Sequence, residues 1–261
     1  MMSPSLIRQR RIIFQRRHPF NADIMRDARS QPSHDFLRNP ASHNVYIYLT
    51  QHIKSLSEHV LARPFSSLSV LDWGCGKGFI TKLVKDMNPR RVDSCDVACN
   101  EADSAFGQPT PLIQAYNIQV TPLHHEYILP YDDSSFDVVI SMGVLEHVGD
   151  DMRSLCEITR VLRPQGLFFC FFLPAAGSWT QWLSRRVGNH YHDRLYTVSR
   201  VFRLAQAANL NVLDVWHRAL LPKNRVRYYP YYYFELLDQF LTEHSWLKYL
   251  ATNIEFVGQK A

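Results

Sequence analysis

The chain has 261 residues, 46% of them hydrophobic, and a formal net charge of +5. This length and composition fit a single folded domain with additions and leave little room for two full domains. The longest apolar stretch, 167–176, contains Pro174 and is shorter than the roughly 20 residues of a membrane-spanning helix. The five cysteines include no CxxC pair, so they indicate neither a disulfide framework nor a zinc site and favour a reducing compartment.

Arginines are concentrated near the N-terminus. Residues 1–40 hold eight arginines and three aspartates, so their local charge (8 − 3) equals the +5 of the whole chain. Three interpretations stay open: a solvated basic arm, a patch for an anionic partner such as acidic lipid, and a mitochondrial-type presequence. We expect a cytoplasmic protein, which would be membrane-peripheral if the arm binds lipid and mitochondrial if the arm is a presequence.

A helix is predicted over 42–61, because Val45, Leu49, Ile53, Leu56 and Val60 recur on one face. The segment 64–67 then leads into the rest of the chain. We therefore expect a basic arm with a helical cap over 1–64 and a larger domain over 65–261.

The segment 70–78, Val-Leu-Asp-Trp-Gly-Cys-Gly-Lys-Gly, predicts a buried strand that turns tightly into a helix. Glycines at alternate positions let bare backbone approach a nucleotide-like ligand and let the helix pack closely on the strand. A tight turn without a ligand is the alternative, which the acid two residues before the first glycine disfavours.

Strands and helices alternate along the chain, which predicts a mostly parallel sheet covered on both faces. Strands are predicted at 68–73, 91–97, 117–121, 136–142, 166–173, 210–217 and 252–259, and helices at 77–87, 150–162 and 196–208.

The glycine loop alone leaves two nucleotide-binding folds open. Dinucleotide-binding enzymes use the spacing GxGxxG, whereas the spacing here is GxGxG. Asp96, at the end of the run 92–96, does not discriminate, since both folds place a carboxylate there on ribose hydroxyls. The segments 135–148, SFDVVISMGVLEHV, and 158–168, ITRVLRPQGLF, decide the question: from about 68 to 173 the chain resembles the class I S-adenosylmethionine-dependent methyltransferases, in their small-molecule "methyltransferase type 11" group.

The resemblance implies an α/β, Rossmann-like, doubly wound and mostly parallel seven-stranded sheet. An N-terminal helical cap would precede it, and a helical insert at about 222–250 would come before the last strand. The cofactor would be S-adenosyl-L-methionine, with S-adenosyl-L-homocysteine as product. Methyl transfer requires an in-line nucleophile in a water-poor site, so we expect no metal.

The resemblance also implies a set of cofactor-binding residues. Asp72 would order the loop and reach the cofactor's amino group, Asp96 would accept both ribose hydroxyls, and Gly78 would serve helix packing. The full set is Asp72, Gly74, Cys75, Gly76, Gly78, Asp96, Val97, His125, Glu126, Ser141, Met142 and Gly143.

One position departs from the family pattern. The acid that often contacts the adenine amino group is replaced by His125, four residues before Leu129-Pro130. Glu126 could substitute if the loop shifts by one residue; alternatively a backbone carbonyl accepts the adenine N–H. Ser141, Met142 and Gly143 follow the fourth strand, at the carboxyl edge where open α/β sheets bind ligands.

Two histidines are candidate general bases. His147 lies in Leu145-Glu146-His147, where the family commonly has a histidine, so structural support of the cofactor loop is the alternative. His192, beside Asp193, should pass over the acceptor pocket, although surface histidines and a helix-start aspartate explain the same residues without catalysis.

The aromatic run 228–234 lies within the predicted insert, leading into a helix that carries Leu237 and Phe240. Its tyrosines could line a pocket for an aromatic, sugar or lipid-linked acceptor, or could cover the N-terminal cap. Nucleic acid is not expected as a partner, since no RNA-binding module accompanies the basic and aromatic residues.

We therefore expect an S-adenosylmethionine-dependent methyltransferase acting on a small-molecule or lipid/sugar-linked acceptor. The alternatives are a non-catalytic cofactor-fold protein that binds an anionic partner through its basic arm, and an NAD(P)-dependent oxidoreductase.

Overall fold

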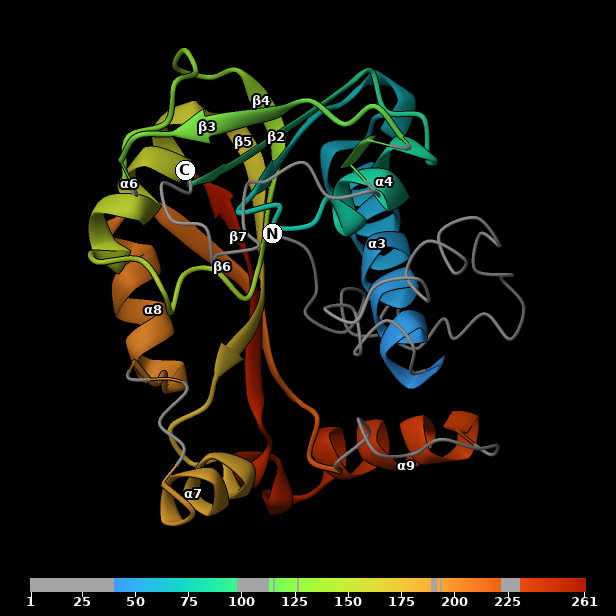
Figure 1. Ribbon diagram of the computed structural model, residues 1–261, viewed down its shortest axis with the longest axis vertical. Coiled ribbons are helices and arrows are strands. Elements are labelled where there is room, and N and C mark those ends of the chain that lie inside the picture. Colours follow the sequence, from blue (N-terminus) through green and yellow to red (C-terminus); the bar gives the residue numbers. More distant parts are fainter. Residues whose placement is uncertain are drawn as a thin grey trace. The chain divides into compact units, whose positions relative to one another are not determined.

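The computed structural model describes residues 40–97, 113–114, 116–125, 127–188, 192, 194–221 and 231–261 (Figure 1). The N-terminal arginines, Glu126 and the run 228–230 lie outside these ranges. Two compact units divide the chain: unit 1 is Met1–Pro122 with Lys223–Tyr228, and unit 2 is Leu123–Pro222 with Tyr229–Ala261. The predicted boundary at 64/65 stays a prediction.

Seven strands form one mostly parallel sheet in the order β3-β2-β1-β4-β5-β7-β6. Strands β1 and β2 are parallel, as are β4 and β5, whereas β7 runs antiparallel to both β5 and β6. The strands are β1 (Ser69–Trp73), β2 (Arg91–Val97), β3 (Val120–Leu123), β4 (Phe136–Met142), β5 (Leu162–Pro174), β6 (Leu210–Arg218) and β7 (Asn253–Lys260). The predicted Rossmann-like α/β fold class is confirmed.

Helices alternate with the strands of the sheet as expected. The described α-helices are α3 (Pro40–Leu61), α4 (Phe79–Lys85), α6 (Asp151–Val161), α7 (Trp179–Arg186), α8 (Val198–Ala207) and α9 (Tyr231–His244), with 3₁₀-helices η2 (Phe65–Ser67) and η4 (Trp246–Leu250). None of the described helices is long and apolar enough to cross a membrane.

In unit 1, the predicted cap helix α3 packs on α4 (Figure 1). Leu49, Ile53 and Leu56 of the predicted apolar face are fully buried. The ring of Tyr46 meets the ring of Phe79 edge-on with centroids 5.1 Å apart, and burial raises the pKa of Tyr46 to about 12. The cap is thus joined to the helix that follows the glycine loop.

In unit 2, β4, β5 and β7 form a largely apolar core. Every residue of β4 before Met142 is buried, and Phe168 of β5 packs edge-on against Phe256 of β7 with ring centroids 5.6 Å apart. Helix α8 covers this part of the sheet through contacts with β6 and β7 (Figure 1). Such apolar runs are typical of strands buried on both faces.

Two predicted strands start more than one residue away from the predicted position. The strand predicted at 166–173 begins at Leu162, because that residue already pairs with Phe136 of β4. The strand predicted to start at 117 starts at Val120, because Asn117 has a left-handed φ of 46° and donates its N–H to the Gln114 carbonyl in a turn.

Helix α9 of the predicted insert buries a polar face. Glu235, Asp238 and Thr242 are buried, whereas Leu237 and Phe240 are 48% and 58% exposed. The Asp238 carboxylate accepts the Leu221 N–H at 2.7 Å, and Glu235 lies 3.4 Å from the Arg218 guanidinium. Polar contacts therefore attach the described part of this helix to the end of β6.

Candidate functional site

The glycine loop of unit 1 needs glycine for its backbone conformation. Gly74, Gly76 and Gly78 have φ values of 72°, 52° and 77°, in the left-handed region that favours glycine. A Cβ on Gly78 would also lie 2.9 Å from Cγ1 of Ile113. This close approach supports the packing role predicted for Gly78.

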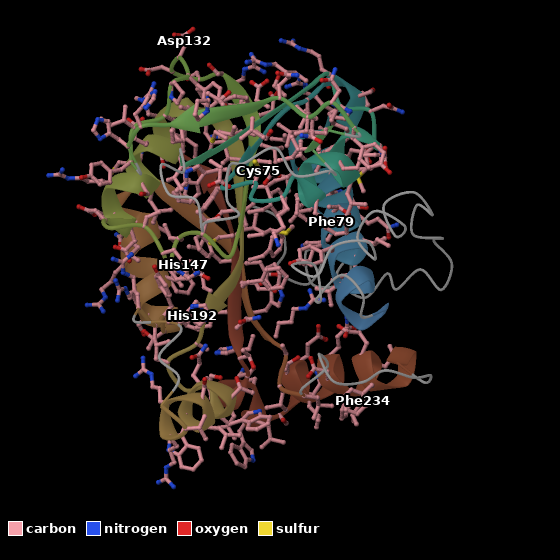
Figure 2. The ribbon with its side chains drawn as sticks, in the orientation of Figure 1. Cys75, Phe79, Asp132, His147, His192 and Phe234 are labelled. Carbon is pink, nitrogen blue, oxygen red and sulfur yellow. The ribbon has the colours of Figure 1, made fainter. Side chains whose placement is uncertain are left out.

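Backbone hydrogen bonds attach the loop to the end of β2. The N–H groups of Gly74 and Cys75 donate to the Cys95 carbonyl at 2.9 and 3.1 Å, and the Gly76 N–H donates to Oδ2 of Asp96 at 2.5 Å. Cys75 is buried, and burial raises the pKa of its thiol. These bonds hold the loop around the Asp96 carboxylate (Figure 2 labels Cys75).

Asp96, next to the last residue of β2, is a buried carboxylate with spare acceptor capacity. Its Oδ1 accepts the Val97 N–H at 2.8 Å, so each oxygen accepts one backbone N–H and keeps a second lone pair. Burial raises the pKa of Asp96, and the bonds from Gly76 and Val97 oppose that shift. Val97 is 40% exposed beside it. A carboxylate and an apolar surface side by side suit a ribose diol and an adenine ring.

Asp72 connects β1 to α4. Its Oδ2 accepts the Thr81 hydroxyl at 2.6 Å, and the Asp72 side chain is buried. Burial raises the pKa of Asp72 to about 7; hydrogen bonds from Thr81 oppose that shift and the charge of Asp96 adds to it. This contact supports the loop-ordering role, and Thr81 is a supporting residue that sequence reasoning missed.

The remaining predicted cofactor contacts belong to unit 2. Ser141 and Met142 end β4, and Gly143 follows with a φ of 69° and donates its N–H to the Phe171 carbonyl at 3.0 Å. Ser141 is fully buried, whereas His125 is exposed in the bend after β3. Glu126 lies outside the described residues. Their contacts with a cofactor stay predictions.

Unit 2 brings both candidate histidines together around a buried acid. The rings of His147 and His192 lie with centroids 5.4 Å apart (Figure 2). Nε2 of His147 is 3.8 Å from Oε1 of Glu146, whose side chain is 2% exposed. One potential ligand atom from each of the three residues lies within 4.8 Å of the others.

Burial shifts all three ionisable groups toward their neutral forms. It lowers the pKa of His147, and burial together with the charge of His147 lowers the pKa of His192. Burial raises the pKa of Glu146 to about 7, and the positive charge of Arg194 opposes that shift. At neutral pH the imidazoles can therefore accept a proton or ligate a cation.

Arg194 and Tyr196 support the loop that carries Glu146 and His147. Arg194 donates to the carbonyls of Val148 at 2.6 Å and Gly149 at 3.0 Å, and the Tyr196 hydroxyl donates to the Leu145 carbonyl at 3.0 Å. Sequence reasoning missed Arg194, Tyr196 and Glu146.

Comparison with known proteins finds similarity to methyltransferases. Residues 71–170 match the family model described as "Methyltransferase domain". A ubiquinone biosynthesis O-methyltransferase from Maricaulis maris is 29% identical over 150 residues, covering 53% of this chain and 57% of that protein. One from Cereibacter sphaeroides is 27% identical over 189 residues, covering 64% of this chain and 70% of that protein. The matches thus span little more than half to about two thirds of these relatives.

A solved structure shows the same fold. The Burkholderia thailandensis 1,6-didemethyltoxoflavin-N1-methyltransferase, with 1,6-didemethyltoxoflavin and S-adenosylhomocysteine bound, has a TM-score of 0.52 and 18% identity, with 95% of this chain and 93% of that chain covered. At that identity the likeness concerns the fold alone. Residues 71–170 thus match a methyltransferase domain, and they lie in a seven-stranded, mostly parallel sheet.

Proposed function

We propose that the protein transfers the methyl group of S-adenosylmethionine to a hydroxyl oxygen of a small-molecule or lipid/sugar-linked acceptor. The arrangement of Asp96 carries the cofactor part of this proposal. Its buried carboxylate is oriented by the N–H groups of Gly76 and Val97 and retains acceptor capacity for two ribose hydroxyls. Oxygen is favoured as the acceptor atom because the matched relatives from M. maris and C. sphaeroides are named O-methyltransferases.

Methyl transfer requires mainly that the protein align the acceptor oxygen with the methyl group and remove the hydroxyl proton. The acceptor oxygen attacks the methyl carbon in line, the carbon–sulfur bond breaks, and S-adenosylhomocysteine leaves with both electrons of that bond. The hydroxyl proton passes to a neutral imidazole, for which His192 and His147 are the candidates. The lowered pKa of each histidine keeps that acceptor form available at neutral pH.

Methyl incorporation from labelled S-adenosylmethionine tests this function. Phenols, catechols and primary amines of similar size should be compared, with S-adenosylhomocysteine and methylated product quantified together. We expect equal amounts of methyl ether and S-adenosylhomocysteine, with phenolic substrates preferred. His192→Ala should slow turnover while cofactor affinity is kept, and the exposed His124→Ala should match wild type.

Methylation of amines alone would contradict the choice of oxygen. Turnover unchanged in both His192→Ala and His147→Ala would exclude the histidines as proton acceptors.

A further inference from the structure

We infer that Glu146, His147 and His192 bind a divalent transition-metal cation. Each residue presents one ligand atom, and the three atoms lie within 4.8 Å of one another. Ligands at about 2.0–2.1 Å from a tetrahedral zinc ion are themselves about 3.3 Å apart. The His147 Nε2 to Glu146 Oε1 distance of 3.8 Å is close to this separation, and the His147 side chain is 48% exposed.

The donor set selects the kind of cation. Two imidazole nitrogens and one carboxylate oxygen suit Zn²⁺, Fe²⁺, Co²⁺ or Mn²⁺, whereas Mg²⁺ and Ca²⁺ prefer oxygen ligands alone. Imidazole binds a metal ion through its neutral form, so binding should weaken as the pH is lowered. Three protein ligands leave further coordination positions for water or a substrate oxygen, as in catalytic rather than structural sites.

The state of Glu146 is a second and independent observation. Its Oε2 is buried and accepts no hydrogen bond from the described part of the chain. A buried carboxylate without compensation is costly. The nearby Arg194 guanidinium donates hydrogen bonds to the carbonyls of Leu145, Val148 and Gly149. A cation between the three side chains would supply the missing partner.

The surrounding contacts orient the ligands as an outer shell does in metal sites. Arg185 of α7 donates to the His192 carbonyl at 3.1 Å. Arg194 and Tyr196 hold the other side of the cluster through the 145–149 carbonyls. Gly143, where a Cβ would lie 3.7 Å from the Glu146 Oε1, leaves room beside the carboxylate. A histidine nitrogen that ligates the cation cannot at the same time accept the hydroxyl proton, so the proton transfer proposed above belongs to the metal-free protein. The reaction without a metal that the sequence predicts stays a prediction.

The site goes beyond methyl transfer and is tested without it. Metal-free, full-length protein should be titrated with Co²⁺ by visible absorption and with Zn²⁺ by calorimetry. We expect one equivalent to bind, and Glu146→Gln, His147→Ala and His192→Ala each to weaken binding at least tenfold. The exposed His124→Ala should bind as wild type does and serves as the control for adventitious surface binding.

Thermal melting and titration with S-adenosylhomocysteine confirm that each variant is folded. Absence of one-to-one binding in the wild type would overturn the metal site, as would wild-type affinity in all three variants. Because S-adenosylhomocysteine affinity is read separately, failure of the metal site and failure of the methyltransferase function give different results.

Discussion

Gly78 combines two constraints that can be separated by experiment. Its φ of 77° is left-handed, and a Cβ would also press on Ile113. Gly188 has nearly the same φ, 78°, with no described atom within 4 Å of a Cβ. Left-handed backbone costs a residue other than glycine about 1–3 kcal/mol, so Gly188→Ala should show that strain alone. Gly78→Ala should lower the free energy of unfolding, measured by urea denaturation, by more than Gly188→Ala does. Equal decreases in the two variants would contradict the packing role of Gly78.

The raised pKa of Asp72 predicts that the stability of the protein depends on pH. Its pKa is near 3.8 in the unfolded chain and about 7 in the folded protein, so between these values the folded state binds more protons. Stability is then lost as pH rises from about 4 to 7, by up to about 1.4 kcal/mol per pH unit from this group. Asp72→Asn removes this pH-dependent contribution to the free energy of unfolding.

The check is the melting temperature of unliganded wild type and Asp72→Asn from pH 4 to 7.5. The melting temperature of Asp72→Asn should rise steadily relative to that of the wild type as the pH rises. Parallel curves would mean that the Asp72 carboxyl titrates alike in both states.

Individual residues differed in how far sequence could predict them. The strand, glycine turn and helix over 69–85 could be predicted because they are contiguous in the sequence. The cofactor contacts of the loop and of Asp96 stay predictions. The proximity of Glu146 to His192 could not be predicted, because the two residues are more than forty positions apart in the sequence. Their arrangement also depends on the hydrogen bonds that Arg194 and Tyr196 donate to the 145–149 loop.

Among the elements, β6, β7 and α9 meet at a buried charge cluster. The Arg218 guanidinium lies 3.4 Å from Glu235 and 3.6 Å from Glu255, and all three side chains are buried. Removing one member of a buried ion pair typically costs about 3–5 kcal/mol, since the partner charge is left buried.

Arg218→Met should therefore lower the free energy of unfolding by about 3–5 kcal/mol in urea denaturation. Arg203→Met on the exposed surface of α8 is the matched control and should change it by less than about 0.5 kcal/mol. A small effect at Arg218 would indicate that the carboxylates are neutral in the folded protein.

Helix α7 was not predicted from the sequence. It has too few apolar residues to reveal itself by periodicity, yet Ser178 accepts the Gln181 N–H at 3.2 Å as its N-cap. A serine followed three residues later by glutamine is the sequence signature of a helix start. The bounds of β2 and β4, in contrast, were predicted correctly. Strand β4 is a mostly apolar run, which indicates its bounds clearly.

For the whole molecule, alternating strands and helices were enough to predict a mostly parallel sheet, because crossover helices must cover both of its faces. The strand order could not be read from alternation. The basic arm and the tyrosines at 228–230 lie outside the described residues, so a contact with anionic lipid and an aromatic acceptor pocket stay predictions.

Calorimetric titration of the purified protein with S-adenosylhomocysteine, beside NADH and beside Asp96→Ala, tests whether the protein binds the methyl-donor cofactor through Asp96. We expect one binding site for S-adenosylhomocysteine and no binding of NADH. Asp96→Ala should bind at least tenfold more weakly while still folded, since hydrogen bonds to a charged group contribute about 1.5–3 kcal/mol. Binding of NADH in place of S-adenosylhomocysteine, or unchanged affinity in the variant, would contradict this expectation.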